Sequence, residues 1–284
     1  MLGLNKKQKN WLWVIGGKHP AAPDYIFIGN EVAPIKAIFN WIEKGYQALL
    51  SKHSLIKTSK IWRFWIYIPK NVFFCGILRE SMDSNGRSYP FAVVGKGSLL
   101  NWQNQWPLLP FAFNETWEKM ELLFSQNISS IKILQNNLNW IIPPKSYWEK
   151  YQVEIKKAWE KYSSLTLGNN LAEIKKIFEA GFKNYTCHNY CFIPFNPICP
   201  VWVPTSLGYA ILYSWGLSMP LASFIGGDIQ HSGFFLFNRT LNKDDFIMLW
   251  LTKNDKKDNN EIEELSLIEV YKKLRAKNGV RNIR

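Results

Sequence analysis

The sequence predicts an α+β fold, in which a mixed or antiparallel sheet is flanked by helices and a C-terminal portion packs on it. Bulky β-forming residues fill positions 63–69 and 72–78, and the polar pair between them indicates a hairpin turn. Apolar residues recur at helical spacing upstream, in residues 35–50. The resulting order β-α-β-β-β-α, followed by helices and then short strands, favours helices layered on the faces of the sheet.

The first half of the chain supplies most of this sheet. Residues 11–15 form a short apolar run that is typical of a strand. Asn30 then provides a helix N-cap ahead of the periodic segment. Beyond the hairpin and a second turn, residues 89–94 indicate a further strand.

A helix and a break follow this strand. Asn114 supplies a second capping signal, and the apolar spacing after it predicts an amphipathic helix that continues to about residue 134. Pro143 and Pro144 then form the clearest interruption in the chain. We therefore expect residues 1–142 to form an N-terminal α/β domain.

Residues 143–284 are expected to form a helical linker region followed by a C-terminal α+β subdomain. Asp244 and Asp245 suit the N-terminus of a helix, although the apolar run after them equally suits a buried strand. Besides this segment, the expected helices span residues 145–162, 171–182 and 262–275, and the expected strands span residues 201–203, 208–215 and 233–237.

Composition limits the class of protein without selecting a function. The 284-residue chain is 47% hydrophobic and 15% aromatic, so it can bury a sizeable core and is too apolar to be disordered. Its net charge of +13 permits attraction to nucleic acid, acidic membranes or acidic proteins. Four cysteines and a polar N-terminus favour a cytoplasmic protein with free thiols. Residues 184–227 carry no charged side chain, but their prolines and polar residues argue against a membrane span.

One predicted turn concentrates residues with special backbone properties. In residues 83–86, Asp83 can accept a hydrogen bond from the backbone two residues on, and Gly86 can adopt positive φ. Arg87 follows where the turn becomes a strand, so its side chain is expected to leave the sheet at its rim. Two interpretations are open: a structural sheet corner in which Arg87 pairs with Asp83, or a functional loop.

A second loop, residues 16–26, carries Lys18, His19, Pro20 and Asp24 after the first predicted strand. As catalytic groups, His19 and Asp24 could form an acid–base pair. As structural groups, Asp24 would instead accept backbone N–H bonds from its own loop, which is the preferred interpretation.

Both loops resemble segments of the TagF family, whose members are accessory proteins of bacterial type VI secretion systems. Segment 82–90, with Asp83, Gly86 and Arg87 at matching positions ahead of an aromatic residue and a proline, is similar to one family motif. Segment 16–26 resembles the opening motif of the family, in which a glycine and a lysine precede a proline and an aspartate.

The resemblance covers residues 11 to about 125 and departs from the family at Pro23, where glycine is usual. Because proline fixes φ and lacks an N–H, the loop is expected to take a different local conformation. Weaker similarity farther along the chain favours a helix at residues 242–252.

The resemblance implies a non-enzymatic, cytoplasmic regulator without a cofactor, which represses assembly or firing of the secretion apparatus after translation. It acts by binding, with a forkhead-associated scaffold protein as the usual partner. Lys18 and Arg87 are then expected to form charge-assisted hydrogen bonds to an acidic or phosphorylated partner, and their loss to leave stability nearly unchanged. The suspected partner-binding residues are Lys18, His19, Pro20, Asp24, Asp83, Gly86 and Arg87.

Two alternatives come from other classes of protein. Cys187, His188, Cys191 and Cys199 could hold zinc in an enzyme or a zinc-stabilised domain, although buried thiols explain the same pattern. The mixture of aromatic and basic residues in 60–65 could bind single-stranded nucleic acid, although a sheet covered on both faces explains it without a ligand.

Overall fold

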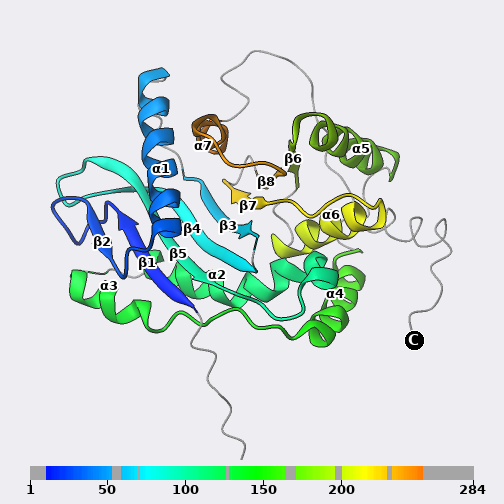
Figure 1. Ribbon diagram of the computed structural model, residues 1–284, viewed down its shortest axis with the longest axis horizontal. Coiled ribbons are helices and arrows are strands. Elements are labelled where there is room, and N and C mark those ends of the chain that lie inside the picture. The colour runs from blue at the N-terminus through cyan, green and yellow to red at the C-terminus, as the bar shows by residue number, and fades with distance from the viewer. Residues whose placement is uncertain are drawn as a thin grey trace, which may run out of the picture.

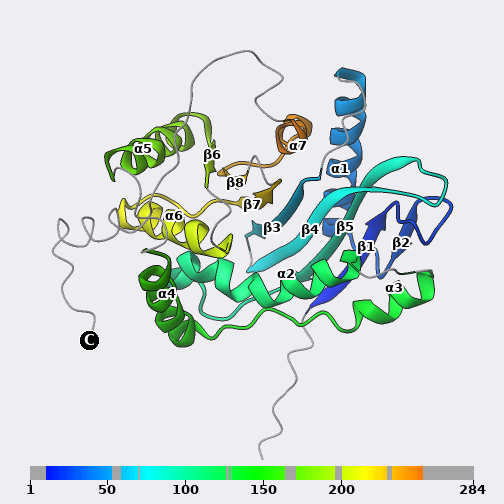
Figure 2. The same cartoon turned by 180° about the vertical axis from the view of Figure 1, so that it is seen from behind.

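The chain is built around one eight-stranded sheet with helices on both faces (Figures 1 and 2). Its strands run in the order β2-β1-β5-β4-β3-β7-β8-β6, and every neighbouring pair is antiparallel. This confirms the predicted α+β class. The computed structural model describes residues 11–251, apart from 53–58, 70, 126–127, 129, 164–170, 196–199 and 229–231.

The first strand, the hairpin and the strand after it were all predicted from the sequence. The turn of the hairpin contains Asn71 at a φ of 60°, a conformation that asparagine tolerates better than most residues. The strands that form the sheet are β1 (Leu12–Gly17), β2 (Ile26–Ile28), β3 (Ile61–Ile68), β4 (Val72–Met82), β5 (Ser88–Gly97), β6 (Tyr190–Pro194), β7 (Ala222–Gly227) and β8 (Ser232–Phe237).

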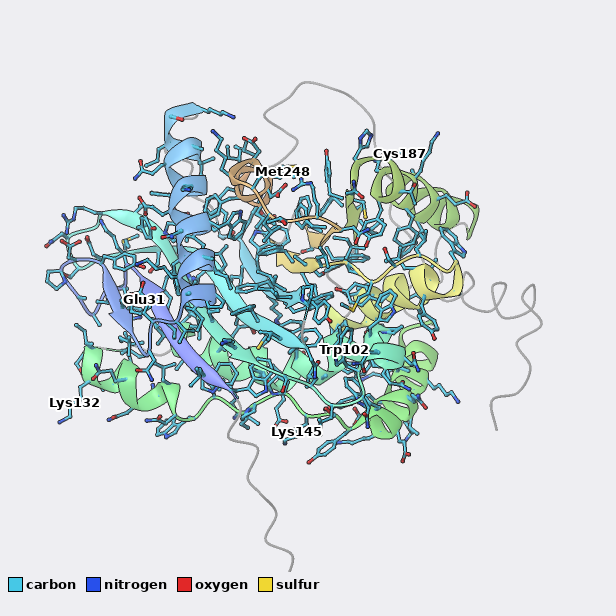
Figure 3. The ribbon with its side chains drawn as sticks, in the orientation of Figure 1. Glu31, Trp102, Lys132, Lys145, Cys187 and Met248 are labelled. Carbon is cyan, nitrogen blue, oxygen red and sulfur yellow. The ribbon has the colours of Figure 1, made fainter. Side chains whose placement is uncertain are left out.

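The helices divide between the two faces of the sheet. Buried residues form one cluster under α1 and α7 and a second, larger cluster under α2 to α6, and Figure 3 shows side chains filling the space between the layers. The helices are α1 (Ala33–Lys52), α2 (Leu109–Ser125), α3 (Ile131–Leu138), α4 (Trp148–Ser163), α5 (Leu171–His188), α6 (Trp202–Ser214) and α7 (Lys243–Trp250), with a 3₁₀ helix, η1 (Gln103–Leu108), before α2.

Strand β3 shows how the sequence builds both layers at once. Trp62 and Phe64 are buried against the α1 and α7 layer, and the indole nitrogen of Trp62 donates to the carbonyl oxygen of Leu249 at 3.0 Å. Trp65 points to the opposite layer, where its indole nitrogen lies 3.1 Å from the hydroxyl of Tyr209. Alternation along one strand thus supplies large aromatic side chains to both cores, as the sequence predicted.

Strand β3 also joins the two halves of the chain. Its residues 61–66 pair with residues 222–227 of β7. The predicted division between residues 142 and 143 lies in the connection between α3 and α4, whereas the hydrogen-bonded sheet continues across both predicted regions. The two halves therefore share one sheet and one pair of cores.

The strands predicted at residues 201–203 and 208–215 are wrong, because this segment forms helix α6. Most of α6 is buried, so its apolar residues surround the helix rather than forming one stripe. Periodicity cannot separate such a helix from a buried strand. Pro204 lies in the first turn, where a proline needs no intrahelical hydrogen-bond partner for its nitrogen.

Several element boundaries also differ from the prediction. Helix α2 begins at Leu109, before the predicted cap at Asn114, because Pro110 is tolerated in a first turn. The single helix expected to continue to residue 134 is divided, and Ser130 caps α3 by accepting from the backbone nitrogen of Ile133.

Further differences and one confirmation lie elsewhere in the chain. Helix α5 continues to His188, and strands β2, β6 and β7 were not predicted. The helix expected at residues 242–252 is confirmed as α7, where Asn242 and Asp245 form a capping box. The helix predicted at residues 262–275 lies outside the described residues. Within the part that the structure describes, no helix has both the length and the apolar character required to cross a membrane.

Candidate interaction site formed by two loops

Two loops meet at one end of the sheet. Residues 18–25 join β1 to β2, and residues 83–87 join β4 to β5. Gly17, the last residue of β1, is paired with Phe91 near the start of β5, so the two connections emerge side by side. We call these residues, 18–25 and 83–87, the two-loop cluster.

Asp83 is the centre of the two-loop cluster, and its side chain is fully buried. Its Oδ1 accepts hydrogen bonds from the backbone nitrogens of Asn85 at 3.0 Å and Arg87 at 2.9 Å. Its Oδ2 accepts from Nε of Arg87 at 2.8 Å and lies 3.1 Å from Nζ of Lys18. The interpretation in which Arg87 pairs with Asp83 is therefore confirmed, and Lys18 shares the same carboxylate.

These contacts keep Asp83 ionised. Burial by itself would raise the pKa of this carboxyl. The hydrogen bonds from the Arg87 backbone, from Lys18 and from the Arg87 side chain have the larger combined effect and lower the pKa to about 2. Because the folded-state pKa lies below the ordinary value of 3.8, the resulting stabilisation is complete above pH 3.8 and is lost as the pH falls through about 2.

Further hydrogen bonds cross-link the two loops. The backbone nitrogen of Ser84 donates to the carbonyl oxygen of Ala22 at 2.8 Å. The carbonyl oxygen of Pro23 accepts from Nδ2 of Asn85 at 3.0 Å and from Nη2 of Arg87 at 2.6 Å. Pro23, the point of departure from the family pattern, therefore contributes an acceptor, and the two loops form one connected unit.

Gly17 and Gly86 are required by the backbone at this end of the sheet. Gly86 has a φ of 78° in the tight turn, where most other residues would be strained. Gly17 has a φ of 130°, and an added Cβ would lie 2.2 Å from the carbonyl oxygen of Pro90. The glycines in both sequence motifs thus serve the geometry of the loops.

His19 is a buried structural residue. Its Nδ1 accepts a hydrogen bond from the backbone nitrogen of Ala21 at 3.1 Å, and its ring lies 5.2 Å from that of Phe91. Burial and the positive charge of Arg79 lower the pKa of His19, which favours the neutral ring that this hydrogen bond requires.

Asp24 has a different role from the one expected of a catalytic partner. Its Oδ1 accepts from the backbone nitrogen of Tyr25 at 2.7 Å, as the structural interpretation predicted. It also lies 3.5 Å from Nη2 of Arg87, and its side chain is 72% exposed.

The suspected binding residues therefore separate into two groups. The side chains of Asp83 and His19 are buried and that of Lys18 is only 15% exposed, so these residues hold the loops together. The outward-facing residues are Pro20, Asp24, Gly86 and Arg87, with the Arg87 side chain 53% exposed.

Sequence reasoning missed how the loops are connected. The cross-links from Ser84 and Asn85 to the first loop bridge about sixty residues of chain, and the pairing of Lys18 with Asp83 does the same. One sequence carries no signal for such a contact. The local bond from Asp83 to Asn85 was accessible, because an aspartate before a tight turn commonly accepts from the backbone two residues on.

The structure separates the candidate metal ligands that it describes. Cys187 and His188 are exposed at the end of α5, whereas Cys191 is buried in β6, where burial raises the pKa of its thiol. Cys199 lies outside the described residues. Among the described residues, no three histidine, cysteine or acidic side chains are grouped so that they could hold a metal ion.

The candidate nucleic-acid platform in residues 60–65 contributes to the protein core. Trp62, Phe64 and Trp65 are almost completely buried and present no free face on which a base could stack. Arg63 is bound to Glu121 of α2, with Nε 2.7 Å from Oε1.

Comparison with known proteins matches the part of the chain that contains both loops to a secretion-associated family. The matching family model is described as type VI secretion system-associated and covers residues 15–139, a range that contains the two-loop cluster. This part of the chain is therefore similar to the TagF N-terminal domain, which agrees with the resemblance drawn from the two loop motifs.

A solved structure extends the similarity to most of the fold. The chain resembles the crystal structure of PA0076 from Pseudomonas aeruginosa PAO1, with a TM-score of 0.50 and 12% sequence identity. The match covers 88% of this chain and 98% of that chain, and at this identity it shows a shared fold. A comparison with the curated proteins found no match.

Proposed function

We propose that this protein is a non-enzymatic, cytoplasmic regulator of a bacterial type VI secretion system. It represses assembly or firing after translation by binding another protein of the system, a forkhead-associated scaffold protein. The observation that carries the proposal is the match of residues 15–139 to the TagF N-terminal domain, because this range includes both loop motifs.

The two-loop cluster is the surface through which we propose that binding occurs. Arg87 uses Nε for Asp83 and Nη2 for Pro23, and its Nη1 has no hydrogen-bond partner among the described residues. This half-exposed guanidinium can donate to a carboxylate or a phosphate of the partner. Because hydrogen bonds already order both loops, little conformational entropy is lost on association.

The partner can be identified by affinity purification from the native host. The tagged protein is purified at moderate salt after nuclease treatment, and the proteins that accompany it are identified by mass spectrometry. Recovery of a forkhead-associated protein or another secretion component supports the proposal. Recovery of nucleic acid alone from a sample without nuclease, with no secretion component in either sample, contradicts it.

The contact role of Arg87 requires a test that separates binding from folding. Arg87→Lys keeps the positive charge beside Asp83 but removes the planar fork, so we expect affinity for the partner to fall at least about tenfold. Arg239→Lys is the matched control, because Arg239 binds the buried Asp245 through two 2.6 Å hydrogen bonds at a different part of the fold.

Thermal unfolding of both variants completes this test. We expect Arg239→Lys to lose stability and retain binding, whereas Arg87→Lys loses binding beyond what its change in Tm explains. If affinity follows Tm in both variants, Arg87 acts only by holding the loops together and is not a contact residue.

A further inference from the structure

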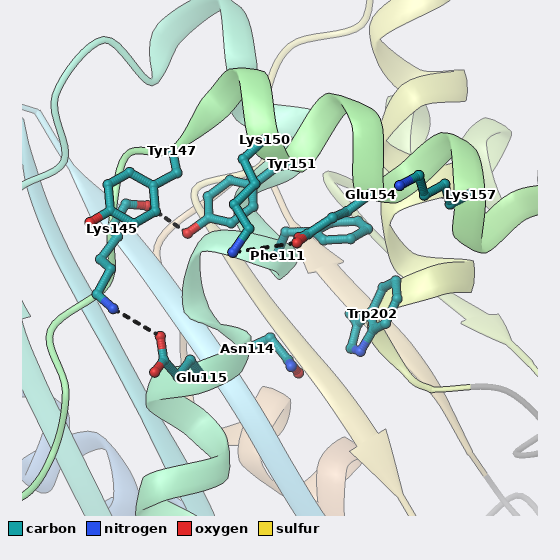
Figure 4. A pocket seen from close by; sticks show the side chains of 10 residues that line it. All are labelled: Phe111, Asn114, Glu115, Lys145, Tyr147, Lys150, Tyr151, Glu154, Lys157 and Trp202. Atoms are coloured by element: carbon teal, nitrogen blue, oxygen red, sulfur yellow. Dashed lines mark hydrogen bonds and ion pairs between the residues drawn. The ribbon is translucent and has the colours of Figure 1, made fainter.

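A cleft of about 370 Å³ lies between α2, α4 and α6, away from the two-loop cluster (Figure 4). Helix α2 lies in the segment that matches the TagF N-terminal domain, whereas α4 and α6 lie beyond residue 139. The cleft is thus formed jointly by the two halves of the chain.

Aromatic side chains form the apolar wall of this cleft. The ring centroid of Phe111 lies 4.5 Å from that of Trp202 and 6.2 Å from that of Tyr151. Tyr147 stands at the opposite end with its side chain 54% exposed (Figure 4). Such a wall can cover an aromatic or large aliphatic side chain of a ligand.

Two ion pairs line the cleft and neutralise most of its charge; the first joins the segment before α4 to α2, and the second lies along α4. Nζ of Lys145 lies 3.2 Å from Oε2 of Glu115, and Nζ of Lys150 lies 3.5 Å from Oε1 of Glu154 (Figure 4). Both pairs are solvent-exposed, so each contributes little stability and can exchange partners readily.

Two hydrogen-bond donors in the lining of the cleft remain unused. Nζ of Lys157 and the indole nitrogen of Trp202 line the same end of the cleft, and neither has a partner among the described residues. The amide of Asn114 is already engaged, accepting from Arg63 at 3.0 Å and donating to Glu118 at 2.7 Å. Because a lysine and an indole nitrogen can only donate, each of these two groups requires an acceptor from a ligand or from water.

We propose that the cleft binds an acidic peptide segment of a protein partner. One apolar side chain of the segment packs on Trp202 and Phe111, and a neighbouring carboxylate accepts from Lys157 and the Trp202 indole nitrogen. The net charge of +13 on the chain attracts such a segment at long range. This proposal uses different residues from the two-loop cluster and does not depend on the proposed secretion function.

A peptide that contacts α2, α4 and α6 together stabilises the packing between them. Binding should therefore raise the Tm of the whole protein progressively, with a roughly logarithmic dependence on peptide concentration above Kd, since the ligand binds only the folded state. A basic peptide lacks the carboxylate and meets repulsion from Lys157, so it should leave Tm unchanged.

The test uses fluorescence anisotropy with the full-length protein and the fluorescein-labelled peptide Glu-Asp-Phe-Glu-Asp. Two control peptides replace the phenylalanine by alanine or the four acids by lysine and arginine. We expect the first peptide to bind and each control to bind at least about tenfold more weakly. The proposal is overturned if the first peptide shows no binding at about 1 mM, or if the alanine peptide binds equally well.

Variants locate the binding to the cleft. Lys157→Glu reverses the free charge, and Trp202→Phe removes the indole nitrogen while keeping an aromatic ring, so each should weaken binding about tenfold. Lys132→Glu on α3 is the matched control, because it makes the same charge change near the β1 and β2 end of the sheet (Figure 3).

The pattern across these variants decides the outcome. Equal weakening by Lys132→Glu and Lys157→Glu shows attraction to the overall charge and overturns the proposal. Arg87→Lys, in the two-loop cluster, should bind the peptide as tightly as the wild type. Failure of the secretion proposal would therefore leave this result unaffected, and the reverse also holds.

Discussion

Asp83 and Arg87 are joined by two hydrogen bonds, one from the Arg87 backbone nitrogen to Oδ1 at 2.9 Å and one from Nε to Oδ2 at 2.8 Å. The first bond closes the turn, and the second directs the guanidinium across to the carbonyl oxygen of Pro23. Arg87 is therefore both part of the loop scaffold and an outward-facing donor, and its two roles have to be tested separately.

The carboxylate of Asp83 is expected to stabilise the fold together with Lys18. Asp83→Asn removes the negative charge that both cations share, so Tm should fall by several degrees in thermal unfolding followed by circular dichroism. Asp24→Asn is the control, because its exposed side chain should change the free energy of unfolding by no more than about 0.5 kcal/mol.

The partnership between these two residues can be measured directly. Lys18→Met removes the ion pair and should lower the free energy of unfolding. In the double variant with Asp83→Asn, Lys18→Met should lower it by less than it does in the wild type, because residue 83 is already neutral. Strict additivity of the two free-energy changes would show that the 3.1 Å contact contributes nothing.

His19 should make stability depend on pH below neutrality. Its pKa is lowered in the folded state, so the unfolded chain binds a proton first, as the pH falls below the ordinary value of 6.5. The stabilisation is complete above pH 6.5 and decreases as the pH falls towards the folded-state pKa. In His19→Asn, whose side-chain oxygen can accept the Ala21 N–H, the loss of stability between pH 7 and pH 5 should be smaller. Parallel denaturation profiles for the two proteins would exclude this role.

The packing of α1 on α7 should be sensitive to a single methyl group. An added Cβ at Gly45 would lie 2.3 Å from Cβ of Phe246, so the two helices would have to separate. We expect Gly45→Ala to lower the free energy of unfolding by about 1–2 kcal/mol, although alanine is the better helix former. Lys44→Ala, at an exposed position of the same helix, is the control and should be nearly neutral. Urea denaturation of both variants measures the difference, and a stabilised Gly45→Ala would show that the helices have room to adjust.

The cysteines should differ strongly in reactivity. Burial raises the pKa of the Cys75 and Cys191 thiols, whereas Cys187 is exposed. In a Cys199→Ser background, an aromatic disulfide reagent should modify one thiol rapidly, and Cys187→Ser should remove this phase. The remaining two thiols should react only after denaturation. In the wild-type protein, which keeps Cys199, protection of Cys187 by stoichiometric zinc, together with zinc retained through purification, would instead favour the metal-binding alternative.

Strand alternation made part of this fold predictable. In β3 and β4 large β-forming residues alternate between two buried faces, and this pattern survives in a single sequence. Helix α6 was mistaken for strands because its apolar residues surround the helix on all sides. The spacing of apolar residues therefore identified the strands and helices that bury a regular set of positions. It failed for α6, where burial on all sides removed the regular spacing.

The same limit applies to the two-loop cluster. The residues of each loop were identified from their own motifs, since an aspartate, a glycine and an arginine with fixed spacing indicate a turn. Their inward or outward orientation depended on Lys18 reaching Asp83 and on Asn85 reaching Pro23, contacts between distant parts of the chain. The cleft at Trp202 has the same origin, because it lies between helices from both halves.

The pairing of β3 with β7 ties the order of synthesis to the order of folding. The ribosome produces β3 about 160 residues before β7, so during translation the nascent β1 to β5 sheet carries an unpaired edge along residues 61–66. This edge is closed only when residues 222–227 have emerged. A messenger that stops after residue 139 would release a polypeptide whose sheet never acquires its neighbouring strand, and such a fragment would be a substrate for chaperones and proteases.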